Sequence, residues 1–216
     1  GGICFINSHY NTITDCTLDD GNDLLVLVQS DYNLVENCTF TKGRHTLWCI
    51  RAGSYNILRN NYFHNELQKI GEIYDNGSFS AKKYGTLEQD AAKYNIVENN
   101  IFAYTPHGDG GPYNGIQFAG QSCIIRNNIF YDNYGGGLGM TLYEDEAYYN
   151  YNNRVYNNTF VNNQGGGISI PRKSSMAPDF FFYKNIFKNN IISNNIYTEE
   201  GNRHNYTDWV ALRGKP

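Results

Sequence analysis

Apolar and polar positions follow one nine-residue pattern, with copies that begin at residues 10, 32, 55, 94, 122, 152 and 184. The fourth and ninth positions of every copy are apolar; in the copy YNIVENNIF they are Val97 and Phe102. A polar pair lies between them, most often two asparagines. Because strand side chains alternate in direction, two short strands joined by a tight bend would turn both apolar positions inward. Such self-similarity predicts a repeat architecture.

The polar pair itself predicts the bend. Its members are Asp15-Cys16, Asn37-Cys38, Asn60-Asn61, Asn99-Asn100, Asn127-Asn128, Asn157-Asn158 and Asn189-Asn190. Asparagine enters the left-handed backbone region at modest cost. An inward asparagine at the same place in each repeat can bond to its equivalent in the next, which satisfies a buried amide. We therefore expect an asparagine ladder, with Cys16 and Cys38 in the ladder position of the first two copies.

A third apolar stretch precedes each copy or joins it to the next, at residues 3–6, 24–28, 47–52, 70–74, 116–119, 138–142 and 168–170. The first two intervals between copies are 22 and 23 residues, enough for a coil of three strands and three turns. Stacked coils of this size form a solenoid in which each coil buries the face of its neighbour. The variable segments flank this third strand, and loops on a rigid scaffold are where function concentrates.

The repeat resembles that of the right-handed parallel β-helix family, the architecture of pectate lyases. The resemblance implies an all-β, single-stranded solenoid of about seven coils over residues 1–197, and a cap or tail over residues 198–216. It also implies a substrate groove along the third strand. Since residue 1 reads as the interior of a coil, we expect natural N-terminal coils or a cap to be missing here. An open end would allow self-association with another chain.

The composition of the chain excludes some classes of binding partner. The net charge of −4 comes without a basic stripe, which argues against nucleic acid, and no apolar run is long enough to span a membrane. Five cysteines do not form a paired framework, so we expect buried thiols, with a disulfide between Cys16 and Cys38 as the alternative. We expect an extracellular or cell-surface protein that contacts polysaccharide.

Candidate chemistry lies on outward positions of the third strand. If Ile50 and Ile73 point inward, the outward side chains are Arg51, Glu72, Gln117, Thr141 and Ser169. Arg51 and Glu72, placed on adjacent coils, could bind a sugar carboxylate and act on its neighbour; the alternative is a surface ion pair. Glu72 and Asp75 could instead supply oxygen ligands to Ca²⁺, the one cofactor that the sequence suggests.

The flanking segments add further candidates. His107 and Asp109 lie on a glycine-rich turn and could supply an acid and a base, or form a plain turn. Lys69 is a further loop candidate. The expected catalytic residues are Arg51, Glu72 and His107, and the expected substrate-binding residues are His45, Trp48, Asp109, Gln117, Tyr143 and Arg172.

Residues 45–75 are also similar to the central coils of alginate lyases and chondroitinase-B-like lyases. Those enzymes use Ca²⁺, a lysine and an arginine, but their close acidic pair and lysine-then-arginine order have no match here, so no assignment is carried over. The leading hypothesis is a polysaccharide lyase or glycoside hydrolase that acts on an acidic polysaccharide. The alternatives are a structural or adhesive β-helix segment of a larger surface protein or filament, and a sugar-binding module without turnover.

Overall fold

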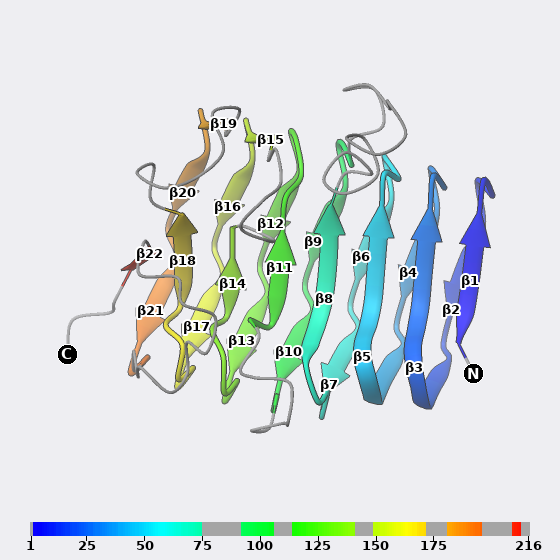
Figure 1. Ribbon diagram of the computed structural model, residues 1–216, viewed down its shortest axis with the longest axis horizontal. Coiled ribbons are helices and arrows are strands. Elements are labelled where there is room, and N and C mark those ends of the chain that lie inside the picture. Colours follow the sequence, from blue (N-terminus) through cyan, green and yellow to red (C-terminus); the bar gives the residue numbers. More distant parts are fainter. Residues whose placement is uncertain are drawn as a thin grey trace.

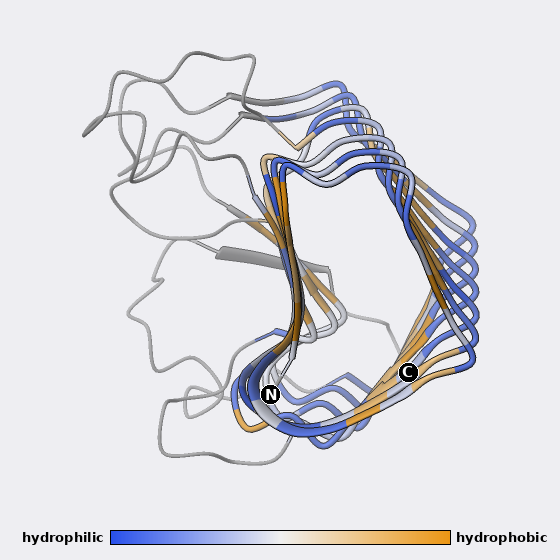
Figure 2. Cartoon of the chain, turned by 90° about the vertical axis from the view of Figure 1, so that its right-hand side faces the viewer, coloured by the Kyte–Doolittle hydropathy of each residue, from blue (hydrophilic) through white to orange (hydrophobic). Residues whose placement is uncertain are grey.

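The computed structural model describes residues 2–74, 92–105, 114–140, 149–171, 181–195 and 209–212. Within them the chain winds into stacked coils of short parallel strands, and the coils superimpose when viewed along the long axis (Figures 1 and 2). This arrangement is a parallel β-helix, as the repeat predicts. The same residues contain no helix that is long and apolar enough to cross a membrane.

One wall of the coils carries the fourth position of each nonapeptide. It is a seven-stranded sheet in the order β2 (Thr12–Thr14), β4 (Leu34–Glu36), β6 (Ile57–Arg59), β9 (Ile96–Glu98), β12 (Ile124–Arg126), β16 (Arg154–Tyr156) and β20 (Ile186–Lys188). The register pairs equivalent residues, so that Val97 lies between Leu58 and Ile125. The predicted inward row is therefore confirmed, and its central members are fully buried.

The other two walls belong to one sheet of thirteen strands among the described residues. The ninth-position wall contains β7 (Tyr62–His64), β10 (Ile101–Ala103), β13 (Ile129–Tyr131), β17 (Thr159–Val161) and β21 (Ile191–Ser193). The third wall contains β1 (Ile3–Ile6), β8 (Lys69–Tyr74), β11 (Ile116–Phe118), β14 (Leu138–Gly139) and β18 (Ile168–Pro171). Two long strands, β3 (Thr17–Val28) and β5 (Thr39–Arg51), run through the bend and belong to both walls. The sequence predicts separate strands there, and this is the main difference in the elements.

Two further pairings lie outside the coil walls. β15 (Tyr149–Tyr151) pairs in parallel with β19 (Phe181–Tyr183) as a separate two-stranded sheet. β22 (Trp209–Leu212) pairs antiparallel with β18. The C-terminal segment thus adds a strand at the side of the third wall, at the opposite end of the axis from β1 (Figure 1).

The interior is a column of stacked apolar side chains. Phe40, Phe63, Phe102, Phe130 and Phe160 stack with ring centroids 4.6–5.2 Å apart. Each ring is fully buried, and this continuous burial provides the main driving force for stacking the coils.

Each coil has three left-handed corners spaced five residues apart, and further left-handed residues occur at Asn7, Gln29 and Ala52. In the coil of residues 94–105 the backbone is left-handed at Tyr94, Asn99 and Tyr104, with φ of 57°, 57° and 58°. The residue after each of these corner positions aligns with its equivalents in the neighbouring coils, which gives three corner rows. The second corner row is the predicted ladder, Cys16, Cys38, Asn61, Asn100, Asn128, Asn158 and Asn190, and its asparagines bond to one another at 2.9–3.1 Å.

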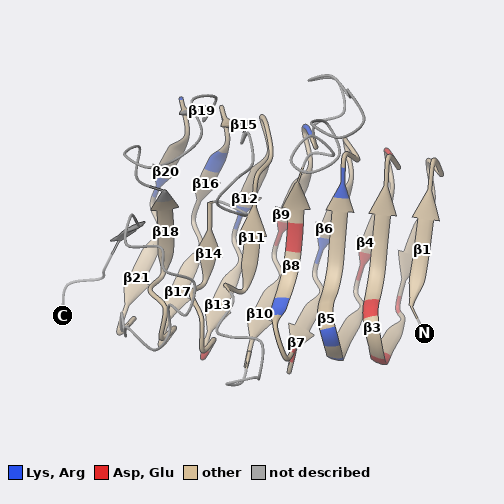
Figure 3. Ribbon diagram, in the orientation of Figure 1, with Lys and Arg blue, Asp and Glu red and all other residues tan. Residues whose placement is uncertain are grey.

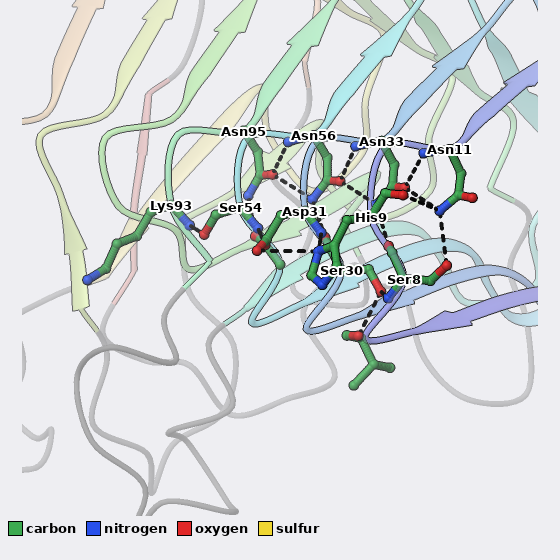
Figure 4. Close-up of polar contacts among 12 residues, drawn as sticks. Ser8, His9, Asn11, Ser30, Asp31, Asn33, Ser54, Asn56, Lys93 and Asn95 are labelled. Atoms are coloured by element: carbon green, nitrogen blue, oxygen red, sulfur yellow. Dashed lines mark hydrogen bonds and ion pairs between the residues drawn. The ribbon is translucent and has the colours of Figure 1, made fainter.

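The first corner row is an additional ladder that the sequence interpretation missed. It contains Asn11, Asn33, Asn56, Asn95, Cys123, Asn153 and Asn185. Figure 4 shows the part from Asn11 to Asn95. The asparagine that follows the first tyrosine of most copies was the available signal. Outside it, Tyr10, Tyr32, Tyr55 and Tyr94 stack face to face with centroids 4.8–4.9 Å apart.

Candidate active site

The register of the third wall determines which outward side chains meet. Glu72 lies opposite Cys49 on one side and Gln117 on the other, whereas Arg51 lies opposite Tyr74. Arg51 and Glu72 lie on adjacent strands, as predicted, but they are offset by two residues, because Ile50 pairs with Ile73 and Arg51 falls beside Tyr74. Arg51 and Glu72 still belong to one cluster, since the field of Glu72 acts on Arg51.

A buried ion pair occupies the centre of this face. Lys69 Nζ lies 2.6 Å from Glu72 Oε1, and both residues are buried, with 1% and 3% of their surface exposed. The opposite charges at the start and middle of β8 are visible in Figure 3. Since burial of an unpaired charge is costly, the pairing of the two residues offsets the cost of burying them. Lys69 is thus an interior cation, not the loop residue that the sequence suggested.

Arg51 and Tyr74 form the more exposed part of the cluster. Arg51 Nε donates a hydrogen bond of 2.5 Å to the Tyr74 hydroxyl oxygen, and both residues are partly buried. Burial, together with the neighbouring Cys49 and Glu72, raises the pKa of Tyr74 and keeps the phenol protonated. Burial tends to lower the pKa of Arg51, but Tyr74 and Cys49 outweigh it and raise that pKa, so the guanidinium stays charged. A fixed cation and a neutral proton donor therefore lie in contact.

Cys49 lies next to this pair, and its thiol is unreactive. Burial raises the pKa of its thiol to about 12. Because only the thiolate is a good nucleophile, Cys49 contributes packing and not reactivity.

His45 lies at the corner that leads into the third-wall part of β5. His45 Nδ1 is 2.7 Å from Asp23 Oδ1, and 40% of the histidine side chain is exposed. The carboxylate orients the ring and leaves its other nitrogen free of any contact with Asp23, so His45 is available as a hydrogen-bonding group, six residues before Arg51 on β5.

Trp48 is not a surface residue, which contradicts its predicted role in substrate binding. It is fully buried, with its ring 6.0 Å from Phe63 and 6.4 Å from Phe102. Gly71, its partner on β8, makes room for the indole, because a side chain at that position would collide with the ring. Trp48 alternates with the outward Cys49, and the sequence could not distinguish the two faces by composition.

Gln117 continues the outward row on β11, as predicted, and is nearly buried. Its Oε1 has no hydrogen-bond partner among the described residues. Five of the predicted site residues lie outside the described part of the chain: Asp75, His107, Asp109, Tyr143 and Arg172.

The predicted Ca²⁺ site stays a prediction. In the described ranges no group of three histidine, cysteine, aspartate or glutamate residues could hold a metal ion. Glu72 supplies a carboxylate, but Lys69 already neutralises it. The geometry described here is that of a cationic and hydrogen-bonding site.

Comparison with known proteins supports the fold. The model of the family described as the right-handed β-helix region matches residues 1–208. Among solved structures, the alginate lyase from Paenibacillus sp. str. FPU-7 is similar at 15% sequence identity and a TM-score of 0.48, over 93% of this chain and 76% of that chain. The sequence has no match among curated proteins.

Proposed function

The chain belongs to the right-handed β-helix family, and from this premise we propose that it is a carbohydrate-active protein, specifically a lyase that acts on a uronate-containing polysaccharide outside the cell. One observation carries the proposal: Arg51 and Tyr74 are in contact on the third wall, and the strand that carries Tyr74 also holds the buried ion pair of Lys69 and Glu72. A charged guanidinium and a protonated phenol in contact fit a substrate that combines a carboxylate with a glycosidic oxygen.

The chemistry assigned to these residues is a β-elimination. A base removes the proton on the carbon next to the uronate carboxylate, and the released electron pair forms a carbon–carbon double bond while the glycosidic carbon–oxygen bond breaks. Arg51 stabilises the negative charge that develops on the carboxylate, and Tyr74 donates its proton to the leaving oxygen. His45 lies six residues before Arg51 on β5, roughly 20 Å along the extended strand, so we assign it to binding of a neighbouring sugar and not to this proton transfer.

Lys69 and Glu72 hold the floor of this site. Because Lys69 and Glu72 pair with each other, β8 carries two buried charged groups beside Arg51 and Tyr74 and neither charge is left without a partner. We assign them a positioning role, because both are buried.

The test is a screen of uronate-containing polysaccharides, with and without Ca²⁺, for the ultraviolet absorbance of the unsaturated product. We expect Arg51→Ala and Tyr74→Phe each to lower turnover by about 10²-fold or more. The matched control is Arg59→Ala, which removes an arginine that pairs with Glu36 on the fourth-position wall. Full turnover by Arg51→Ala, or no product from any such polysaccharide, would overturn the proposal.

A second candidate, a structural or adhesive β-helix without turnover, is favoured by one observation. The stacked tyrosines Tyr10, Tyr32, Tyr55 and Tyr94 present exposed edges along the outside of the first corner. This candidate predicts polysaccharide binding or self-association without any unsaturated product. Sedimentation velocity together with the same screen distinguishes the two candidates.

A further inference from the structure

The third corner row differs from the other two. It contains Gly21, Gly43, Glu66, Thr105, Asn133, Asn163 and Asn195, each following a left-handed residue. At one end of the row the asparagines form a ladder, in which Asn133 Nδ2 donates to Asn163 Oδ1 at 2.8 Å and to the Phe102 carbonyl at 3.1 Å. Glu66 therefore occupies a position where amides act as donors.

Glu66 is completely buried at this position. Its Oε1 accepts a hydrogen bond of 3.2 Å from the Gln68 backbone N–H, while its Oε2 has no partner among the described residues. Gly43 on the preceding coil makes the room, because any side chain there would collide with Glu66 Oε2. A carboxylate can only accept hydrogen bonds, whereas a protonated carboxyl has one donor and so resembles the amide of the row.

Charged groups surround this carboxyl on the neighbouring strands. Among the described residues, those that act on it are Asp23 from β3 and Lys69 from β8. Asp23 is bonded to His45 of β5, and Lys69 is paired with Glu72. Burial and then Asp23 raise the pKa of Glu66 to about 7, against the lowering effect of the Gln68 and Leu67 backbone N–H groups and of Lys69.

We propose that Glu66 is a proton-controlled switch in the coil corner that precedes Lys69. When protonated, it fills the third corner row as a neutral, amide-like group. When ionised, it is a second buried carboxylate that competes with Glu72 for the Lys69 ammonium. The proton therefore controls both the stability of this corner and the ion pair beneath Arg51 and Tyr74.

The direction of the effect follows from linkage. A carboxyl whose folded-state pKa lies above its ordinary value of 4.5 binds its proton more tightly in the folded protein. Its contribution to stability is complete below pH 4.5 and is lost as the pH rises to about 7. This behaviour is opposite to that of an ion-paired surface carboxyl and does not depend on the proposed catalytic activity.

The first test compares chemical unfolding of the wild type and Glu66→Gln between pH 4.5 and pH 7.5. The glutamine mimics the protonated carboxyl at every pH. We expect the unfolding equilibrium constant of the wild type to rise on the order of 10²-fold relative to that of Glu66→Gln across this window. Glu98→Gln, which removes a glutamate paired with Arg126 on the fourth-position wall, is the control and should not remove the wild-type pH dependence.

A second measurement uses the wild type alone, in case Glu66→Gln does not fold. We expect the infrared band of a protonated carboxyl to persist at pH 6 and to disappear with a midpoint near pH 7. The absence of that band at pH 6, or an identical pH dependence of unfolding in the wild type and Glu66→Gln, would overturn the proposal.

Discussion

At the scale of single residues, the corner asparagines combine a backbone task with a side-chain task. The first member of each pair takes the left-handed conformation, as Asn127 does with φ of 56°. The second, such as Asn128, joins three coils: its Oδ1 accepts from the Asn100 backbone N–H, and its Nδ2 donates to the Val97 carbonyl and to Asn158. The residue types at the two positions are therefore not interchangeable.

This division predicts different costs for neighbouring substitutions. Asn128→Ala leaves the backbone N–H of Asn100 and the carbonyl of Val97 buried without these partners. We expect it to lower the free energy of unfolding by about 2–4 kcal/mol. The exposed Asn127→Gly should change it by less than about 1 kcal/mol, because glycine accepts a positive φ. Urea unfolding of both variants checks this, and equal costs would contradict it.

The residues of the corners were largely predictable from the sequence. Asparagine pairs at a fixed distance from apolar positions indicate both the bend and the inward amide. Glu66 was not predictable in this way, because its copy reads as a loop until the spacing of five residues from Asn61 places it in the third corner row.

At the scale of the strand, the face to which a side chain points and the residue that lies opposite it on the next strand are set separately. Alternation correctly placed Ile50 and Ile73 in the apolar core and aligned Glu72 with Gln117 on the alternate positions. Alternation alone does not determine the register, because a shift of two residues keeps each side chain on the same face but changes its neighbour on the adjacent strand. That shift separates Arg51 from Glu72 and brings Tyr74 to it.

The two walls carry ion pairs with different energetic roles. Lys69 and Glu72 are buried on β8, whereas Arg59 and Glu36 join β6 and β4 with 40% and 21% of their side chains exposed. Removal of one buried partner leaves an uncompensated charge, but removal of an exposed partner leaves a charge that water can solvate.

We therefore expect Lys69→Met to lower the free energy of unfolding by about 3–5 kcal/mol. Arg59→Met, the matched control, should cost at most about 1 kcal/mol. The double variant Lys69→Met/Glu72→Gln should recover part of the loss, since neither position then carries a buried charge without its partner. Denaturant midpoints at pH 7 measure all three, and a cost for Arg59→Met equal to that of Lys69→Met would refute the distinction.

At the scale of the whole molecule, the column of coils divides its cysteines into two groups. Cys4 and Cys16 are exposed, whereas Cys38, Cys49 and Cys123 are buried, and all five are free thiols. Burial raises the pKa of both Cys49 and Cys123 to about 12. The predicted alternative of a disulfide between Cys16 and Cys38 is absent from this structure.

Alkylation at pH 8 should therefore modify Cys4 and Cys16 promptly and the other three thiols only on unfolding. Mass spectrometry before and after addition of denaturant counts the modified sites. Cys16→Ser should remove one of the thiols that are alkylated in the native protein and leave the three buried thiols unchanged. Rapid modification of Cys49 in the native protein would contradict this packing of the third wall.

Because each coil bonds in register to the coil beside it, a formed coil acts as a template for the next. The contacts that add a coil join residues such as Asn100 and Asn128, which are separated by 28 positions, and such separations do not grow as coils accumulate. The entropic cost of adding a coil therefore depends on the length of the next connecting loop and not on the number of coils already formed. We infer that folding starts at one complete pair of coils and spreads at a rate set by the length of the next connecting loop.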